Sequence, residues 1–193
     1  MNKISKLLAS VVLIALSASL PAQAAVETYK IDPVHSSIAF KVRHFFTPVP
    51  GSFGKFEGTI KVDRDNLENN SMEASIDAAS ITTANEKRDS DLKSENFFLV
   101  EKFPHLTFKG KSWKKTGENQ FSVTGDLTIK DVTKSVILDV KLLGFGPGMR
   151  GAFLSGWEAT TKLDRTDYGM SYGPGFIGNE VDVSITVEAV RQG

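Results

Sequence analysis

Apolar and polar residues alternate with a period of two along most of the chain beyond residue 36. Such alternation is typical of β-strands that have one buried and one wetted face, as in antiparallel sheets. Asn, Asp, Gly and Pro separate the alternating segments and mark turns. The pattern predicts about eight strands, most of them five to seven residues long, in the segments 38–42, 56–62, 72–78, 106–108, 121–129, 136–142, 157–163 and 181–189.

One segment breaks the alternation. Residues 83–94 are polar, contain good helix formers and lack Gly and Pro, with Thr83 or Asn85 in position to cap a helix. This segment is expected to form a short helix or an irregular lid. No internal repeat or long linker divides the remaining chain, so we expect one domain.

Eight amphipathic antiparallel strands can form either a two-sheet sandwich or a closed barrel. The apolar faces are rich in Phe, Ile, Val and Leu, and an eight-stranded barrel encloses either side chains or one small ligand. A membrane barrel needs longer strands than those expected here and presents its apolar residues to lipid. We therefore predict an all-β fold, an eight-stranded antiparallel soluble barrel with one short helical segment.

The N-terminus resembles a secretory signal peptide. Two lysines precede an apolar stretch at 7–20, and small residues at positions 22 and 24 form a cleavage site. The apolar stretch is short for a membrane span, although a retained anchor is the alternative. We expect residues 1–24 to be a signal peptide and residues 25–193 to form the secreted domain.

Composition excludes several classes of protein. The 193 residues contain 23 basic and 23 acidic side chains and no cysteine. The absence of cysteine excludes disulfide-stapled scaffolds, thiol enzymes and cysteine-ligated metal sites. Removal of the two lysines of the signal peptide leaves a net charge of −2, so no basic excess points to nucleic acid.

No recognised catalytic or nucleotide-binding motif is present. The histidines His35, His44 and His105 match no local metal motif, and isolated histidines are more often hydrogen-bonded than metal-bound. Asp89 and Asp91 could pair as carboxylates, but a solvated surface is the more common role of such residues. We therefore expect no cofactor, no metal and no catalysis.

Aromatic residues are unusually frequent in the expected loops. They cluster at 45–56 among Pro and Gly residues, at 97–103, at 145–153 and at Phe176. Apolar loop residues must cover an apolar surface or contact an apolar partner. Two interpretations remain open: these residues plug the ends of the barrel, or they line the mouth of a cavity for an apolar ligand.

A series of motifs, in order from Asp32 to the end of the chain, resembles the YceI-like family. Each motif alone is weak, but the ordered set is specific. The motifs are Asp32-Pro33-Val34-His35-Ser36 with the strand that runs to His44, the Gly-x-Phe-x-x-Phe-x-Gly element at 51–58, and the segments 79–83, 88–94, 97–108, 125–134 and 165–170.

The resemblance implies an elongated, lipocalin-like barrel in the bacterial periplasm that binds a long isoprenoid lipid, of the polyprenyl or ubiquinone type, without established catalysis. Three residues depart from the family pattern: Asp91 replaces a usual His, Asp131 a usual Gly and Ser135 a usual Pro. An anionic Asp91 would disfavour a pyrophosphate head group more than a neutral quinone.

Two other function classes stay open. One is a ligand-free structural or stress-response barrel filled by its own side chains. The other is a lipid-modifying enzyme with His35 or His44 as its base.

The apolar tail is expected to contact the inward-facing side chains of the strands, and the head group to lie at a polar mouth. Besides the isoprenoid ligand, we expect no nucleic-acid partner and no membrane span after removal of the signal peptide; transient contact with a membrane and the oligomeric state are left open. The candidate head-group residues are His35, His44, Arg88 and Arg165, and the candidate cavity residues are Ile38, Phe40, Val42, Phe56, Ile60, Ile76, Leu127, Ile129, Leu138, Val140, Trp157 and Val183.

Overall fold

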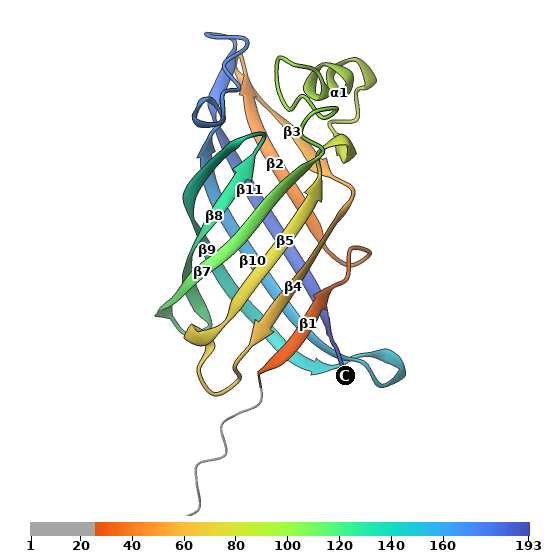
Figure 1. Cartoon of the computed structure of the whole chain (residues 1–193), viewed down its shortest axis with the longest axis vertical. Coiled ribbons are helices and arrows are strands. Elements are labelled where there is room, and N and C mark those ends of the chain that lie inside the picture. The colour runs from red at the N-terminus through yellow and green to blue at the C-terminus, as the bar shows by residue number, and fades with distance from the viewer. Residues whose placement is uncertain (1–25) are drawn as a thin grey trace, which may run out of the picture.

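A computed structural model describes residues 26–193, so the expected signal peptide lies outside the described residues. The chain is built almost entirely of antiparallel strands (Figure 1). The strands are β1 (Glu27–Ile31), β2 (Ser37–His44), β3 (Thr47–Phe53), β4 (Phe56–Val62), β5 (Ser71–Asp77), β6 (Ile81–Thr82), β7 (His105–Gly117), β8 (Gln120–Ile129), β9 (Val132–Pro147), β10 (Phe153–Asp164) and β11 (Ile177–Arg191).

These strands occupy eight positions around a closed barrel. β1 and β2 form one interrupted strand, because both pair with β11, and the pairs β3–β4 and β5–β6 are interrupted in the same way. Each position pairs with the next along the chain, and β11 closes the circle against β1 and β2. The predicted eight-stranded antiparallel barrel is confirmed, and closure excludes the sandwich.

The aromatic segment after His44 is a strand rather than the loop that its prolines suggested. Pro48 and Pro50 lie in β3, where they face Arg43 and Lys41 of β2. The other edge of β3 pairs with β6 only at Ser52 and Phe53. Proline is tolerated here because an edge strand leaves one row of backbone N–H groups without a ladder partner.

Strands β7 to β11 are longer than expected, with β9 reaching 16 residues and β11 reaching 15. The prediction of five to seven residues was wrong because charged outward residues and glycines near the strand ends weaken the alternation there. The outward-facing positions of these strands hold charged residues such as Lys109, Asp139, Lys141 and Glu158. A membrane barrel presents apolar residues at such positions. Within residues 26–193, no helix is long and apolar enough to cross a membrane.

The predicted helical segment contains one α-helix, α1 (Glu86–Lys93), at one end of the barrel (Figure 1). Asn85 is its cap, and the Asn85 side chain accepts a hydrogen bond from the Arg88 backbone N–H at 3.0 Å. Short 3₁₀ turns occur at Leu67–Asn69 (η1), Ala78–Ser80 (η2), Met149–Gly151 (η3) and Arg165–Tyr168 (η4). The turn between β2 and β3, the α1 segment and the loop after η4 lie together at this α1 end, opposite the chain's C-terminus.

The opposite end of the barrel is filled by its own side chains. Trp113 and Trp157 meet edge to face with ring centroids 5.6 Å apart, and Phe121 and Phe145 pack against them. Trp157 is 3 % exposed, and its indole N–H donates to the Ser155 hydroxyl at 3.0 Å. This region, which we call the closed end, is a conventional packed core.

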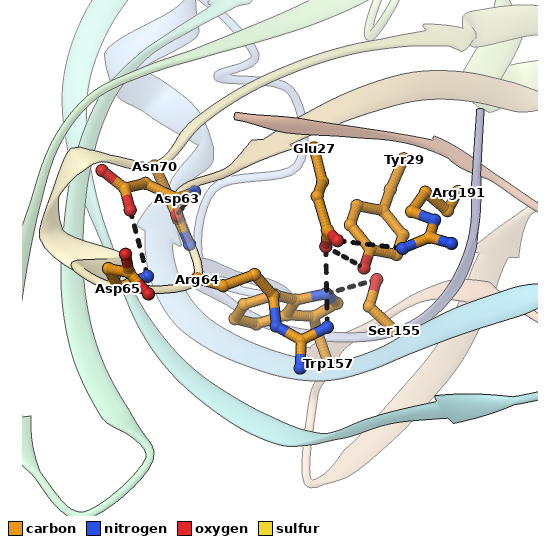
Figure 2. Close-up of polar contacts among 9 residues, drawn as sticks. All are labelled: Glu27, Tyr29, Asp63, Arg64, Asp65, Asn70, Ser155, Trp157 and Arg191. Carbon is orange, nitrogen blue, oxygen red and sulfur yellow. Dashed lines mark hydrogen bonds and ion pairs between the residues drawn. The ribbon is translucent and has the colours of Figure 1, made fainter. Parts of the chain in front are cut away.

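A polar cluster seals the closed end (Figure 2). The Glu27 carboxylate accepts hydrogen bonds from the Tyr29 hydroxyl at 2.6 Å and from Arg191 at 3.0 Å, and it lies 3.6 Å from Arg64. The Arg64 guanidinium stacks over the Phe145 ring at 4.3 Å. Burial and the bond to Glu27 raise the pKa of Tyr29 to about 12, so its hydroxyl remains a donor.

Candidate functional site

The α1 end of the barrel is hollow. A cavity of about 1070 Å³ extends through this half and reaches α1, the end of β2 and the loop after η4. Its wall is predominantly apolar, and many wall residues that point inward stay only half-buried because they face space rather than other side chains. A cavity of this size, at the top of the usual range of roughly 300–1,000 Å³, can enclose most of a lipid-sized molecule.

The structure divides the twelve predicted cavity residues into two groups. Ile60, Val140 and Trp157 face inward but lie in the packed core of the closed end, so they do not line the cavity. Strand parity predicts the direction in which a side chain points but not its depth along the barrel axis, which explains this difference. The nine that line the cavity are Ile38, Phe40, Val42, Phe56, Ile76, Leu127, Ile129, Leu138 and Val183.

Aromatic residues outside the regular alternation complete the wall. Phe97, Phe98, Tyr172 and Phe176 all line the cavity, and none was among the predicted cavity residues. Periodicity could not place them because they come from irregular segments. The signal that marked them was the high aromatic content of the expected loops, which favoured either end plugs or a cavity mouth.

The Phe40 ring lies directly over a glycine of the neighbouring strand. A Cβ atom at Gly51 would approach the Phe40 ring to 2.3 Å, so only glycine fits beneath the ring in this position. Gly51 and Phe40 face one another in the register of β2 and β3. This close approach brings the ring flat against the wall and leaves the centre of the cavity open.

Charged groups border the cavity at the α1 end. Arg88 and Asp91 of α1, His44 of β2 and Arg165 of η4 all contribute to its wall, so three of the four candidate head-group residues are brought together. The fourth candidate, His35, lies in the turn between β1 and β2, away from the cavity. Sequence order could not show this, because His35 and His44 are separated by the whole length of β2.

Arg165 is committed to its own loop. It is 5 % exposed, and its guanidinium donates to the backbone carbonyls of Met170, Tyr172, Ile177 and Gly178. Burial lowers the pKa of Arg165, although arginine remains charged in proteins. The residue therefore positions the loop that forms one side of the cavity mouth, and few of its N–H groups are left for a ligand.

Arg88 and Asp89 fasten α1 to β6. Arg88 donates to the Thr83 hydroxyl at 2.7 Å and to the Thr83 carbonyl at 3.0 Å. Asp89 accepts from the Thr83 backbone N–H at 2.7 Å and from the Thr82 hydroxyl at 3.0 Å. Partial burial alone would raise the pKa of Asp89, but these hydrogen bonds outweigh it and lower the pKa. The α1 segment is thereby fixed as a cover over the mouth.

His35 belongs to a separate cluster on the outer wall. Its Nδ1 lies 2.8 Å from the Asp32 carboxylate and 3.7 Å from that of Glu188. The hydrogen bond to Asp32 and the two negative charges raise the pKa of His35. Among the described residues, these three side chains form the group whose ligand atoms lie close enough together to hold a divalent cation. In the structure, His35 pairs with both carboxylates.

Of the three departures from the family pattern, only Asp91 borders the cavity. Asp131 is exposed in the turn between β8 and β9, and Ser135 is exposed on β9. The Asp91 carboxylate is the acidic group among the residues that line the cavity, and basic residues outnumber it. The basic lining residues are Arg43, Lys87, Arg88 and Arg165.

Comparison with known proteins agrees with this architecture. The family model of the YceI-like domain matches residues 29–189. The chain belongs to the YceI-like family. It is 36 % identical over 167 residues to UPF0312 protein plu2095 of Photorhabdus laumondii, covering 85 % of this chain and 86 % of that protein.

Two solved structures share the fold. BcnA of Burkholderia cenocepacia superimposes with a TM-score of 0.76 at 21 % identity, covering 82 % of this chain and 98 % of BcnA. A domain from Saccharophagus degradans, described as polyisoprenoid-binding, superimposes with a TM-score of 0.67 at 13 % identity and covers 85 % of this chain and 98 % of that domain. At these identities the likeness establishes the barrel alone.

Proposed function

We propose that this YceI-like protein binds a long-chain isoprenoid lipid in the hollow half of its barrel. The cavity of about 1070 Å³ with its apolar wall carries the proposal. An isoprenoid tail is apolar, and burying it gains about 0.8 kcal/mol for each methylene-sized group. The polyisoprenoid-binding domain of Saccharophagus degradans with the same fold supports this class of ligand.

The volume of the cavity, about 1070 Å³, is large enough for a tail of several isoprene units.

The charges at the mouth bear on the head group of the lipid. The Asp91 carboxylate borders the cavity and disfavours an anionic group placed against it, and Arg165 donates to four backbone carbonyls. Arg43, Lys87 and Arg88 also line the cavity and would attract an anionic group. The mouth is therefore compatible both with a neutral quinone head group and with a polyprenyl phosphate.

The proposal places the secreted protein in the periplasm as a carrier, since the apolar ligand is too insoluble to cross water alone. It assigns no catalysis. His44 is the one histidine in the cavity wall among residues 26–193, and no hydrogen bond from its ring to another side chain orients it there as a base. A positioning hydrogen bond is the usual mark of a general base.

Organic extraction of the purified protein, followed by mass spectrometry, tests the proposal. We expect an isoprenoid lipid at about one molecule per barrel. A barrel that yields no lipid would support the structural alternative. Turnover of a bound isoprenoid that is lost in His44→Ala would support the enzyme instead.

A further inference from the structure

The most exposed aromatic side chains of the described residues project from the α1 end of the barrel. Phe46 is 95 % exposed and Phe45 is 52 % exposed, and together they form the turn between β2 and β3. Tyr172, in the loop after η4, is 48 % exposed. The exposed large apolar side chains of the closed end, Val26, Leu143 and Met149, are not aromatic.

An unbroken series of rings joins the exposed tip to the cavity. Phe46 lies 6.4 Å from Phe45, measured between ring centroids, and Phe45 stacks on Phe176 at 5.9 Å. Phe176 meets Tyr172 at 6.4 Å, and Tyr172 meets Phe97 at 5.7 Å. Because Phe176, Tyr172 and Phe97 line the cavity wall, the aromatic surface continues from the inside of the barrel to the exposed Phe45–Phe46 turn.

The backbone of this turn is held in a costly conformation. Phe45 has a φ of 49°, in the left-handed region that Asn and Gly occupy readily and that a phenylalanine adopts at a cost. Arg43 donates a hydrogen bond to the Phe45 carbonyl, which helps to hold the turn. A turn optimised for folding alone would favour Asn or Gly at this position, so a phenylalanine there points to another role.

The same hairpin is positively charged. Between Asp32 and Glu57 the chain has no acidic residue, and Lys41 and Arg43 lie exposed on β2 below the tip; Asp182 of β11 faces Lys41 in the register, whereas Arg43 is nearer the tip. The secreted chain as a whole carries a slight negative charge, so this hairpin is a local exception. Aromatic rings flanked by basic residues are the combination that anchors proteins at the interface of an anionic bilayer.

We propose that the Phe45–Phe46 turn docks the α1 end of the barrel on an anionic phospholipid bilayer. The two rings insert at the head-group level, Lys41 and Arg43 face the lipid phosphates, and the series of rings gives an isoprenoid tail an apolar path between bilayer and cavity. That the transferred ligand is an isoprenoid rests on the proposed function. The docking of the turn on the bilayer does not depend on it.

Vesicle flotation tests the docking. The purified secreted protein is mixed with vesicles of phosphatidylglycerol and phosphatidylcholine, or of phosphatidylcholine alone. Wild-type protein should float with the anionic vesicles and only weakly with the neutral ones. Phe46→Ser should reduce partitioning about tenfold or more, because a buried phenyl ring contributes more than the roughly 1.4 kcal/mol of a tenfold change.

Met149→Ser is the matched control, because it removes an equally exposed apolar side chain at the opposite end of the barrel. It should float as the wild type does. Docking is contradicted if wild-type protein ignores anionic vesicles, if Phe46→Ser floats unchanged, or if Met149→Ser loses as much. A concentration-dependent dimer that Phe46→Ser dissociates, without vesicle binding, would assign the turn to self-association and overturn the proposal.

A second measurement separates docking from ligand binding. Phe46 is outside the cavity wall, so delipidated Phe46→Ser should bind detergent-dispersed prenyl lipid like the wild type but load more slowly from anionic vesicles. Vesicle binding without any prenyl-lipid binding would contradict the proposed function alone. Prenyl-lipid binding without vesicle binding would contradict docking alone.

Discussion

The two ends of the barrel are built from the same strands but are filled differently. At the closed end, long inward side chains such as Trp113, Phe121 and Trp157 meet across the axis and leave the interior solid. At the α1 end, the inward residues line a cavity even though several of them, such as Phe56 and Phe176, are aromatic, and the Phe40 ring lies over Gly51. The way the inward side chains are arranged, rather than strand number or polarity, therefore distinguishes the half of this barrel that can hold a ligand.

The ends also differ in how they are finished. A charged cluster around Glu27 seals the closed end, with Tyr29, Arg64 and Arg191 directed at one carboxylate (Figure 2). The α1 end is finished by α1 and the Arg165 loop, which are held by hydrogen bonds and by a second buried cluster that includes Phe97, Tyr168 and Met170. We expect the interior of the closed end to contribute stability without binding, and the hollow part of the α1 end to bind the ligand.

Removing a large aromatic side chain at each end should give the largest contrast. Trp157→Ala should lower the free energy of unfolding by about 3–5 kcal/mol, because it leaves a cavity in a packed core. Phe40→Ala should cost about 1–2 kcal/mol, because its half-buried ring already faces open space. Chemical denaturation of delipidated protein measures both, and equal losses would contradict the division.

Enlarging a valine at each end tests the same division in the opposite direction. Val140→Trp should destabilise the protein by about 1–3 kcal/mol, because a 5 % exposed side chain has no room to grow. Val183→Trp should change the melting temperature little, since the indole can occupy the cavity. Thermal melts of delipidated protein would contradict the hollow interior if Val183→Trp were the more damaging change.

Two glycines that lie beneath aromatic rings, Gly51 and Gly125, allow a comparison with a smaller expected difference in stability. At Gly125 a Cβ would approach Phe108 to 2.3 Å and the Lys109 backbone carbonyl to 2.7 Å, so a strand must move. At Gly51 only the Phe40 ring obstructs, and that ring can swing into the cavity. We expect Gly125→Ala to cost about 1 kcal/mol or more by overpacking and Gly51→Ala clearly less, as measured by denaturant titration.

The seal at the closed end should give the smallest effect, and one that depends on pH. Burial alone would raise the pKa of Glu27, but hydrogen bonds from Tyr29 and Arg191 and nearby positive charge outweigh it and lower the pKa. The contribution of ionised Glu27 to the free energy of unfolding is therefore fully present above the ordinary carboxyl pKa of 4.5. It is lost as the pH falls through the lowered pKa of Glu27.

Glu27→Gln should accordingly cost about 1 kcal/mol near neutral pH, and its difference from the wild type should shrink as the pH is lowered below about 4. Urea denaturation at several pH values measures this difference. A difference that stays constant across the acid range would show that the charge of Glu27 does not contribute.

The sequence alone was sufficient for the barrel but not for the position of the cavity. Period-two alternation depends on which face of a strand is buried, so it identified the eight strand positions and the inward direction of Ile60, Val140 and Trp157. Depth along the axis depends on register, which links residues far apart in the chain, such as Phe40 with Val183. No local pattern encodes that pairing.

The mouth was partly predictable for a similar reason. Arg88 and Arg165 stand in motifs that the family resemblance marked, and both reach the cavity wall. Their engagement with Thr83 and with the loop after η4 depends on tertiary contacts. His35 was misplaced by the same reasoning, because its motif suggested a role at the mouth while its partner Glu188 lies far along the chain.

The central claim is that a prenyl lipid occupies only the hollow half of the barrel. Native mass spectrometry of delipidated protein titrated with a prenylquinone tests it most directly, with Val183→Trp and Val140→Trp compared against the wild type. We predict one bound lipid per chain for the wild type and for folded Val140→Trp, and clearly weaker binding for folded Val183→Trp. Undiminished binding to folded Val183→Trp would contradict the account.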